Sequence, residues 1–325
     1  MKKIVIDTLG GDNGALPLLC GSARCMKEHS DVFCVFSGDK EEIDKIMGDN
    51  SISRDRYTVL NTKEYVTNSQ SPMSVFGGCD NSSMVLALEY LRDNECAGMI
   101  SAGNTGALLI GTICRLGLVK GLKRPALSSA LPAVDGSYIC LVDCGANVDC
   151  TANDLCEFAK LGTAFVKSMY GIESPRVALL STGKEKGKGN KATKEAYALL
   201  ESSGLNFTGN LEGSDVLLGK ADVLACDGYA GNIVLKDTEA TGKIAAAMSK
   251  RILASLAPES AEKVSKELER NFDFNSRGGA TFLGTKKTVV KMHGAANSST
   301  AVSCIEQVLK LSESGFDTAV ENALS

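Results

Sequence analysis

The sequence predicts an α/β protein with largely parallel strands, and three features carry that prediction. Short apolar or β-branched runs recur along the chain. Most alternate with patterns typical of helices about 10–15 residues long, and glycine with a polar residue directly follows most runs. Such runs are typical of parallel strands buried on both faces between layers of helices. The predicted strands are residues 3–6, 32–36, 57–60, 97–100, 138–142, 176–180, 221–226 and 288–290.

The composition is that of an ordinary globular protein. The chain has 325 residues, of which 44% are hydrophobic and 23% charged, enough for a substantial core. It opens with MKKIVIDTLGG, whose apolar run is too short for a signal peptide, and no uncharged span of about 18 residues occurs. These features predict a cytoplasmic protein. With no linker or repeat, we expect one α/β domain over residues 1–325, made of two packed lobes.

Twelve cysteines stand beside only two histidines. In a chain of this size without an export signal, we expect reduced thiols packed as small hydrophobic residues, notably Cys34, Cys114, Cys140 and Cys226. The spacing of the densest group matches no zinc pattern, so we expect no metal site. That group is Cys140, Cys144, Cys150 and Cys156.

Net charge is −4, which excludes the general electrostatic footprint of a nucleic-acid-binding protein. Two basic clusters nevertheless occur: five lysines within residues 184–194, and Lys120 with Lys123 and Arg124. They fit an anionic substrate or an acidic partner, unless they are simply solvated faces.

The loops after the first and fourth predicted strands are rich in small residues. In α/β folds, ligands bind beyond the carboxyl ends of the strands. The first loop, residues 7–14, lacks the G-x-G-x-x-G order of a dinucleotide site. The second, residues 101–107, precedes an apolar helix predicted over 108–118 and forms a plausible anion cradle. The candidate binding residues are Asp7, Gly10, Gly11, Ser101, Gly103, Asn104 and Thr105.

After the fifth predicted strand comes a loop containing Asn147, another candidate binding residue. Thr151 and Asp154 then have the spacing of a capping box, which predicts a helix running through Val166.

Residues 181–190, STGKEKGKGN, lie between a predicted strand and a predicted helix over 191–200. We expect Gly183, Gly187 and Gly189 to adopt positive φ and turn N–H groups inward, with the helix N-terminus adding partial positive charge. The loop is no Walker A motif, because neither Ser nor Thr follows Lys188. It predicts a site for a phosphate-like anion, although a solvated surface turn remains an alternative.

The last strand ends are followed by residues 227–232 (DGYAGN) and 291–294 (KMHG). Ordinary turn chemistry explains one such loop more easily than the whole set. Beyond them, residues 245–257 and 261–271 predict two helices broken at Pro258. Their apolar face contains Met248, Ile252, Leu253 and Leu256. Three alternatives are open for this face: packing in the core, packing on a dimer mate, or contact with a membrane surface. Residues 298–324 predict closing helices.

Ten stretches, in family order over nearly the whole chain, resemble the PlsX-type phosphate acyltransferases of bacterial phospholipid synthesis. They are IDTLGGDNGALP (6–17), NSSMVLA (81–87), ISAGNTGAL (100–108), RPALSSALP (124–132), DCGANVDC (143–150), GKEKGKGN (183–190), GNLEGSD (209–215), CDGYAGNIVLK (226–236), GGATFLG (278–284) and KMHG (291–294).

The resemblance implies a layered α/β/α fold, similar to phosphotransacetylase and isopropylmalate dehydrogenase, and a homodimer. It implies transfer of a fatty acyl group from acyl carrier protein to inorganic phosphate, giving acyl phosphate for a membrane glycerol-3-phosphate acyltransferase. The family's two-helix projection, similar to residues 245–271, implies peripheral contact with the inner face of the cell membrane.

This chemistry needs neither an enzyme nucleophile nor a cofactor, but a held dianion, an oxyanion donor and a proton for the thiol. We expect Lys188 to neutralise phosphate and the backbone of Gly187, Gly189 and Asn190 to cradle it. Asn104, Asn232 or His293 would orient the carbonyl or leaving group. Asp227 is expected to orient a lysine or cap a helix rather than act as base.

Two departures from the family pattern keep alternatives open. Residues 76–80 (FGGCD) stand where the family carries a basic cluster, and residues 293–296 read HGAA rather than HGSS. The alternatives are acyl transfer from acyl-CoA, as in phosphotransacetylases, and a carrier-binding scaffold with weakened catalysis. The sequence sets neither the acyl chain length nor the carrier-docking surface.

Overall fold

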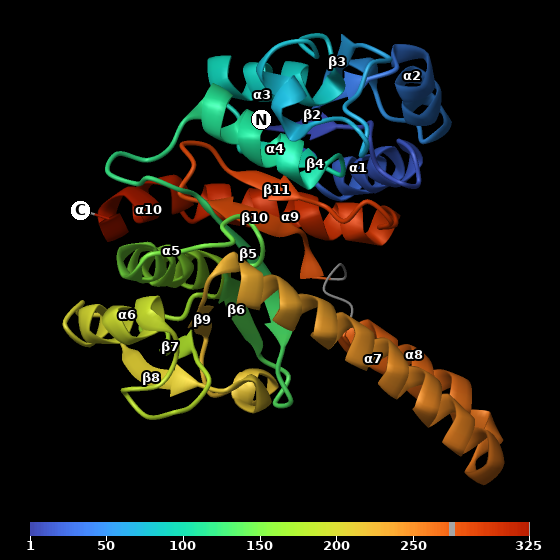
Figure 1. Cartoon of the computed structure of the whole chain (residues 1–325). Coiled ribbons are helices and arrows are strands. Elements are labelled where there is room, and N and C mark those ends of the chain that lie inside the picture. The colour runs from blue at the N-terminus through green and yellow to red at the C-terminus, as the bar shows by residue number, and fades with distance from the viewer. Residues whose placement is uncertain (273–276, 325) are drawn as a thin grey trace. The chain divides into compact units, whose positions relative to one another are not determined.

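The computed structural model describes residues 1–272 and 277–324. The chain divides into two compact units. Unit 1 comprises residues 1–125, 168–170 and 278–325, and unit 2 comprises residues 126–167 and 171–277. Each unit is built on a mostly parallel sheet (Figure 1), which confirms the predicted α/β class.

The sheet of unit 1 has the strand order β3-β2-β1-β4-β11-β10, and only β10 runs antiparallel to its neighbour β11. In register, Ser101 lies between Asp7 and Lys291, so three polar residues end adjacent parallel strands. The strands are β1 (Lys2–Asp7), β2 (Val32–Gly38), β3 (Tyr57–Asn61), β4 (Gly98–Ser101), β10 (Ala280–Leu283) and β11 (Val289–Lys291).

Alternation along the strands distributes apolar side chains to the two faces of this sheet. Ile4 and Ile6 join the core under α1, α2 and α9, while α3 packs against the strands as well. The helical elements of unit 1 are α1 (Leu16–Glu28), α2 (Lys40–Asp49), η1 (Arg54–Arg56), η2 (Pro72–Phe76), α3 (Ser83–Asp93), α4 (Thr105–Gly111), η3 (Thr112–Leu116), α9 (Ser298–Glu313) and α10 (Phe316–Leu324).

The sheet of unit 2 has the order β5-β6-β9-β7-β8, parallel except for the β5–β6 hairpin. Gly162 lets α5 approach it closely, since a Cβ there would lie 2.6 Å from Val223. The elements are β5 (Ala126–Pro132), β6 (Tyr138–Val142), α5 (Ala152–Tyr170), β7 (Val177–Leu180), α6 (Lys191–Glu201), β8 (Phe207–Leu211), η4 (Gly213–Leu218), β9 (Val223–Ala225), α7 (Gly228–Leu256) and α8 (Pro258–Phe272).

All eight predicted strands are present, and β5, β8 and β10 are additional. The capping box is confirmed: Thr151 Oγ1 accepts from Asp154 N at 3.3 Å, and Asp154 Oδ2 accepts from Thr151 N at 2.8 Å. The helix that it starts continues past Val166 to Tyr170. The apolar helix predicted over 108–118 begins earlier, at Thr105, and ends in a π-turn at Leu116.

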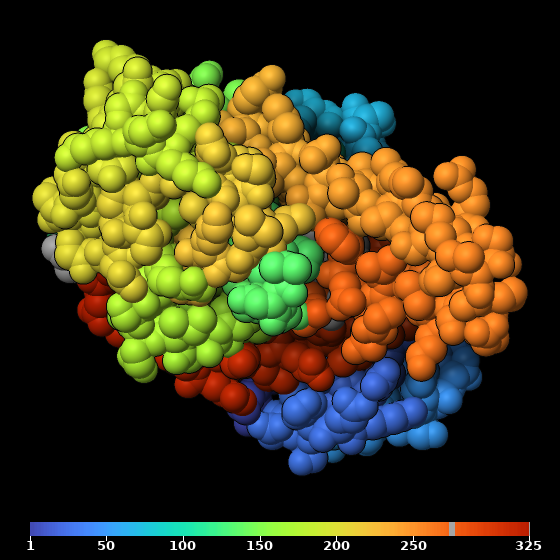
Figure 2. All heavy atoms as spheres, turned by 90° about the horizontal axis from the view of Figure 1, so that it is seen from below, coloured from blue at the N-terminus to red at the C-terminus, as the bar shows by residue number. Residues whose placement is uncertain are grey.

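The helical projection differs from the prediction in two respects. Its first helix begins at Gly228 rather than at 245, and its second begins at Pro258 rather than at 261, while the break before Pro258 is confirmed. The two helices lie side by side as an orange pair (Figures 1 and 2). Core packing is the wrong alternative for Met248, Ile252 and Leu256, which are 48%, 51% and 75% exposed.

The cysteines are free thiols, and Cys34, Cys140 and Cys226 are buried as expected. Cys114 is exposed instead, in a π-turn whose buried residues are Thr112 and Leu116. Within the described residues, no helix is long and apolar enough to cross a membrane.

Candidate functional site

The glycine-rich loop of residues 181–190 joins β7 to α6 in unit 2. Of its three glycines, only Gly189 has a positive φ, +98°, so the expectation is wrong for Gly183 and Gly187. Gly183 is required for another reason: a Cβ there would lie 2.8 Å from Cγ of Lys188. The absent side chain at 183 therefore leaves the space that the Lys188 stem occupies.

Two helices begin beside this loop. Asn190 caps α6, its Oδ1 accepting from Thr193 N at 2.9 Å, and Asp227 caps α7, its Oδ1 accepting from Ala230 N at 2.7 Å. Because β7 and β9 are adjacent and parallel, both helices start at the same edge of the sheet. Capping uses one N–H group at each helix, and at α7 Gly228 N also donates to Asn147 O at 2.7 Å. The first turn of α6 therefore offers more N–H groups than that of α7, while both helices supply partial positive charge.

A cavity of about 220 Å³ lies at these helix starts. Its polar lining includes Ser181, Gly189, Asn190, Thr193 and Asp227. Ser181 Oγ is buried and has no hydrogen-bond partner among the described residues. A hydroxyl donor and two helix N-termini form a site suited to an anion, although the Asp227 carboxylate opposes negative charge.

The lysines of this loop differ in their partners. Lys184 pairs with Asp215 at 3.0 Å, and Lys186 pairs with Glu201. Lys188 is exposed, and within residues 1–272 and 277–324 its side chain makes no ion pair or hydrogen bond. It is therefore the loop cation that is available to neutralise a bound phosphate.

Asp143, at the end of β6, organises the neighbouring loop. Its buried carboxylate accepts from Leu127 N at 2.9 Å, Ala146 N at 3.1 Å and Asn147 N at 2.6 Å, and from Asn147 Nδ2 at 2.9 Å. Burial raises the pKa of Asp143, while these hydrogen bonds lower it. Asn147 thus shapes the loop, and the exposed Asn232 on α7 lies beside its Gly145.

In unit 1, the structure joins Asp7, Ser101 and Gly103. Ser101 Oγ donates to Asp7 Oδ2 at 2.6 Å and accepts from Gly103 N at 3.1 Å. Asp7 is fully buried, and its Oδ1 has no hydrogen-bond partner among the described residues. Burial raises the pKa of Asp7 to about 6.

Lys291, which sequence reasoning did not single out, completes this cluster. It is 9% exposed, and its Nζ donates to Ala102 O at 3.1 Å and to Met292 O at 2.5 Å. These bonds join the loop that carries Asn104 to the loop that carries His293. Burial lowers the pKa of Lys291 to about 8, opposed in part by the negative charge of Asp7.

The remaining unit 1 candidates have local structural contacts. Asn104 caps α4, which begins at Thr105, by accepting from Ala107 N at 2.9 Å. His293 is exposed, and its Nδ1 accepts from Ala295 N at 3.2 Å. Gly10 and Gly11 line a cavity of about 310 Å³ with Tyr65.

The predicted site residues thus fall into two groups, one in each unit. Within the described residues, no group of three or more His, Cys, Asp or Glu side chains is placed to hold a metal ion. The unit 1 group is Asp7, Gly10, Gly11, Ser101, Gly103, Asn104, Thr105 and His293. The unit 2 group is Asn147, Gly187, Lys188, Gly189, Asn190, Asp227 and Asn232.

Comparison with known proteins gives a family match over nearly the whole chain. The family described as "Fatty acid synthesis protein" matches residues 2–318. A phosphate acyltransferase of Bacillus cereus is 37% identical over 314 residues, 95% of this chain and 94% of the relative, and one of Bacillus thuringiensis is 36% identical over the same lengths.

Solved structures share the fold. A phosphotransacetylase from Streptococcus pyogenes aligns with TM-score 0.64 at 18% identity, over 96% of this chain and 94% of that one. A 4-hydroxythreonine-4-phosphate dehydrogenase from Klebsiella pneumoniae aligns with TM-score 0.53 at 12% identity, over 96% and 98% of the two chains.

Proposed function

The chain belongs to the fatty acid synthesis protein family, and from that premise we propose that it transfers an acyl group from a thioester to inorganic phosphate. The observation that carries this proposal is the anion site of unit 2. Two helix N-termini and the Ser181 hydroxyl border one cavity, and Lys188, which has no ion pair among the described residues, stands next to Gly189 in the same loop. Phosphate is an anion that such donors bind well.

In the proposed reaction, a phosphate oxygen attacks the thioester carbonyl carbon. The new C–O bond forms, the C–S bond breaks, and the departing thiolate takes up a proton. Lys188 neutralises the phosphate and the charge that develops, while the backbone N–H groups of residues 187–190 hold it in place. Asn232, Asn104 and His293 stay candidates for orienting the carbonyl or the leaving group. Asp227 acts through the α7 N-terminus that it caps.

We propose acyl carrier protein, an acidic protein, as the donor. Glu201 and Asp215 pair with two lysines of the 184–194 cluster. Electrostatic attraction of the carrier would therefore depend on the remaining lysines of the cluster. Lys194 has no ion pair among the described residues, while Lys191 stands 4.0 Å from Glu195.

The exposed apolar row of α7 supports a further part of the proposal, a homodimer with peripheral membrane contact that delivers acyl phosphate to a membrane acyltransferase. The row recurs every four residues near the end of the helix, at Ile244, Met248, Ile252 and Leu256. Replacing Leu256 by Asp should weaken flotation with anionic vesicles. Replacing Ile244 by Asp should shift the oligomeric mass if the row also joins two copies.

The decisive experiment measures thiol release from acyl carrier protein thioesters with and without inorganic phosphate. Phosphate-dependent release supports the proposal. Release from acyl-CoA but not from the carrier thioester would assign the chain a phosphotransacetylase-type donor. Binding of carrier without release from either donor would indicate a scaffold. Turnover should also survive EDTA, because the proposed steps use no metal.

A further inference from the structure

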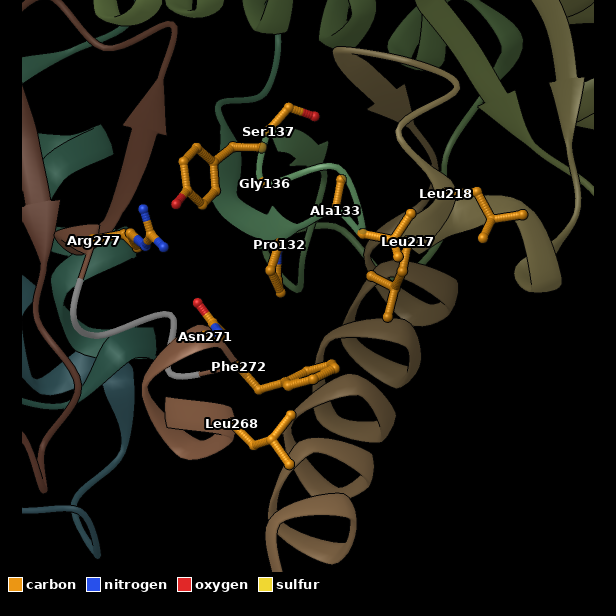
Figure 3. Close-up of a pocket in the computed structure, with 12 residues that line it drawn as sticks. Pro132, Ala133, Gly136, Ser137, Leu217, Leu218, Leu268, Asn271, Phe272 and Arg277 are labelled. Atoms are coloured by element: carbon orange, nitrogen blue, oxygen red, sulfur yellow. The ribbon is translucent and has the colours of Figure 1, made fainter. Parts of the chain in front are cut away.

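A larger cavity lies elsewhere in unit 2, beside the C-terminal end of α8 (Figure 3). Its volume is about 450 Å³, within the roughly 300–1,000 Å³ of small-molecule pockets. It is formed by the end of β5 with its hairpin, the start of β6, the end of η4, the end of α8 and Arg277. None of the proposed chemistry uses these residues.

The walls of this cavity are apolar and held in place. Leu217, Leu268 and Phe272 project from η4 and α8. Val134 N donates to Leu217 O at 2.9 Å, which ties the β5–β6 hairpin to η4. Phe272 packs where Gly242 of α7 has no side chain, since a Cβ there would lie 2.3 Å from Phe272 Cβ.

One side of the cavity carries a cation. The Arg277 guanidinium carbon lies 4.1 Å from the centre of the Tyr138 ring. Figure 3 shows Arg277 and the leucines of η4 on opposite sides. Within the described part of the chain, Arg277 makes no ion pair or hydrogen bond, and stacking on Tyr138 holds its planar group of N–H donors at the cavity.

The cavity is separate from the anion site. Pro132 pairs with Tyr138 in the hairpin, and Val142, at the other end of β6, pairs with Ala225 next to the anion site. At about 3.3 Å per residue, the length of β6 separates the two edges by roughly 13 Å. An anion on Arg277 would therefore be distinct from phosphate held near Lys188.

We propose that this cavity is a second ligand site that binds an anionic amphiphile with a single alkyl chain. The chain would lie among Leu217, Leu268 and Phe272, because transfer of methylene groups from water to an apolar wall is favourable. The carboxylate or phosphate head would accept paired hydrogen bonds from Arg277. Free fatty acids and acyl phosphates both belong to this class.

The test is calorimetric titration of the full chain with decanoate, decyl phosphate and 1-decanol, each below its aggregation limit. Saturating inorganic phosphate keeps the anion site occupied. Arg277→Gln should raise the Kd of both anions by about tenfold or more, because they lose charged hydrogen bonds. The Kd of decanol should change by no more than about twofold. Arg251→Gln, an exposed arginine on α7, is the matched control and should change nothing. The tighter anion identifies the head group.

Leu268→Trp, which fills the cavity, should weaken all three ligands, with thermal unfolding checking that the variant folds. Anion binding that withstands both Arg277→Gln and Leu268→Trp would overturn the inference. So would binding lost in Lys188→Ala but kept in Arg277→Gln, which would place the ligand in the phosphate loop and leave the proposed function standing. Arg277-dependent binding without any acyl transfer would support this site while refuting that function.

Discussion

The strand ends of the two units use charge in opposite ways. In unit 1, Asp7 and Lys291 are buried, and Lys291 Nζ donates two hydrogen bonds to backbone carbonyls. In unit 2, Lys188 is exposed with no ion pair among the described residues, in the loop that ends at the N-terminus of α6. The first arrangement holds loops in place, and the second leaves charge available to a ligand.

Polar residues after a strand therefore serve two purposes, holding loops and binding ligands, which composition does not separate. A buried charge without full hydration is tolerated only when surrounding groups replace water. An exposed lysine in a glycine-rich loop keeps its hydration and can exchange it for phosphate. Substitution should therefore affect stability in unit 1 and activity in unit 2.

The largest expected effect is at Lys188. Lys188→Ala should lower phosphate-dependent acyl transfer by about 100-fold or more, as loss of one preorganised charged donor typically does. The midpoint of thermal unfolding should stay unchanged, because the side chain is exposed. Thiol release and thermal denaturation measure the two quantities. Activity within a few-fold of the unaltered chain would remove Lys188 from the mechanism.

Lys291→Met should have the opposite pattern to Lys188→Ala: its main effect should be on stability rather than on activity. It leaves the carbonyls of Ala102 and Met292 buried without donors, and each such loss destabilises by about 1–3 kcal/mol. Denaturant unfolding should show a lower free energy of unfolding, and Lys291→Arg should recover part of it. Unchanged stability would mean that water or relaxation satisfies both carbonyls. The exposed Lys286→Met serves as control.

Structure that depends on neighbouring residues could be predicted from the sequence, whereas burial by residues distant in sequence could not. The capping box of Thr151 and Asp154 and the strand at residues 138–142 depend on neighbours within a few positions, and both are confirmed. The missed strand β5 (ALSSALP) contains two serines and a proline, and β8 (FTGNL) contains glycine and asparagine, so neither shows an apolar run.

The site shows the same division. That Gly, Asn and Asp gather at strand ends was predictable, because parallel strands end at a common edge. That Asn104, Asn190 and Asp227 cap helices follows from their position before a helix. The role of Lys291 was hidden, because its donors reach Ala102, which is 189 residues away in sequence. Asp143 could be placed at a strand end from the sequence, but its hydrogen bond with Leu127 N, 16 residues away, could not.

Titration of Asp7 should have a smaller effect on stability, and the direction of its pH dependence can be predicted. Its pKa is raised to about 6 by burial, above the ordinary value of 3.8, so the folded chain binds more protons than the unfolded chain between these pH values. The contribution of Asp7 to stability is therefore largest at low pH and falls as pH rises through about 6, by up to about 1.4 kcal/mol per pH unit.

Asp7→Asn removes this titration while keeping an oxygen that can accept from Ser101. Free energies of unfolding should be measured from pH 4.5 to 7.5. As pH rises, the free energy of unfolding of the variant should increase relative to that of the unaltered chain. Lys291 faces the same cluster, as does Asp12, but the lowered pKa of Lys291, about 8, places its titration above this window. A parallel pH dependence of the two proteins would show that Asp7 does not titrate there.

The smallest expected effect concerns the donor and tests whether the unit 2 charges also steer a partner. Exposed lysines attract an acidic carrier over about 10 Å at low salt, and added salt shortens that range. The KM for a carrier thioester should rise several-fold toward about 0.3 M salt, while the KM for a neutral thioester changes little. Lys194→Glu should mimic high salt with little change in kcat, and Lys45→Glu, an exposed lysine of α2 in unit 1, should not. Equal salt sensitivity for both donors, or equal effects of the two reversals, would place carrier docking elsewhere and reduce the role of the exposed charges to binding phosphate.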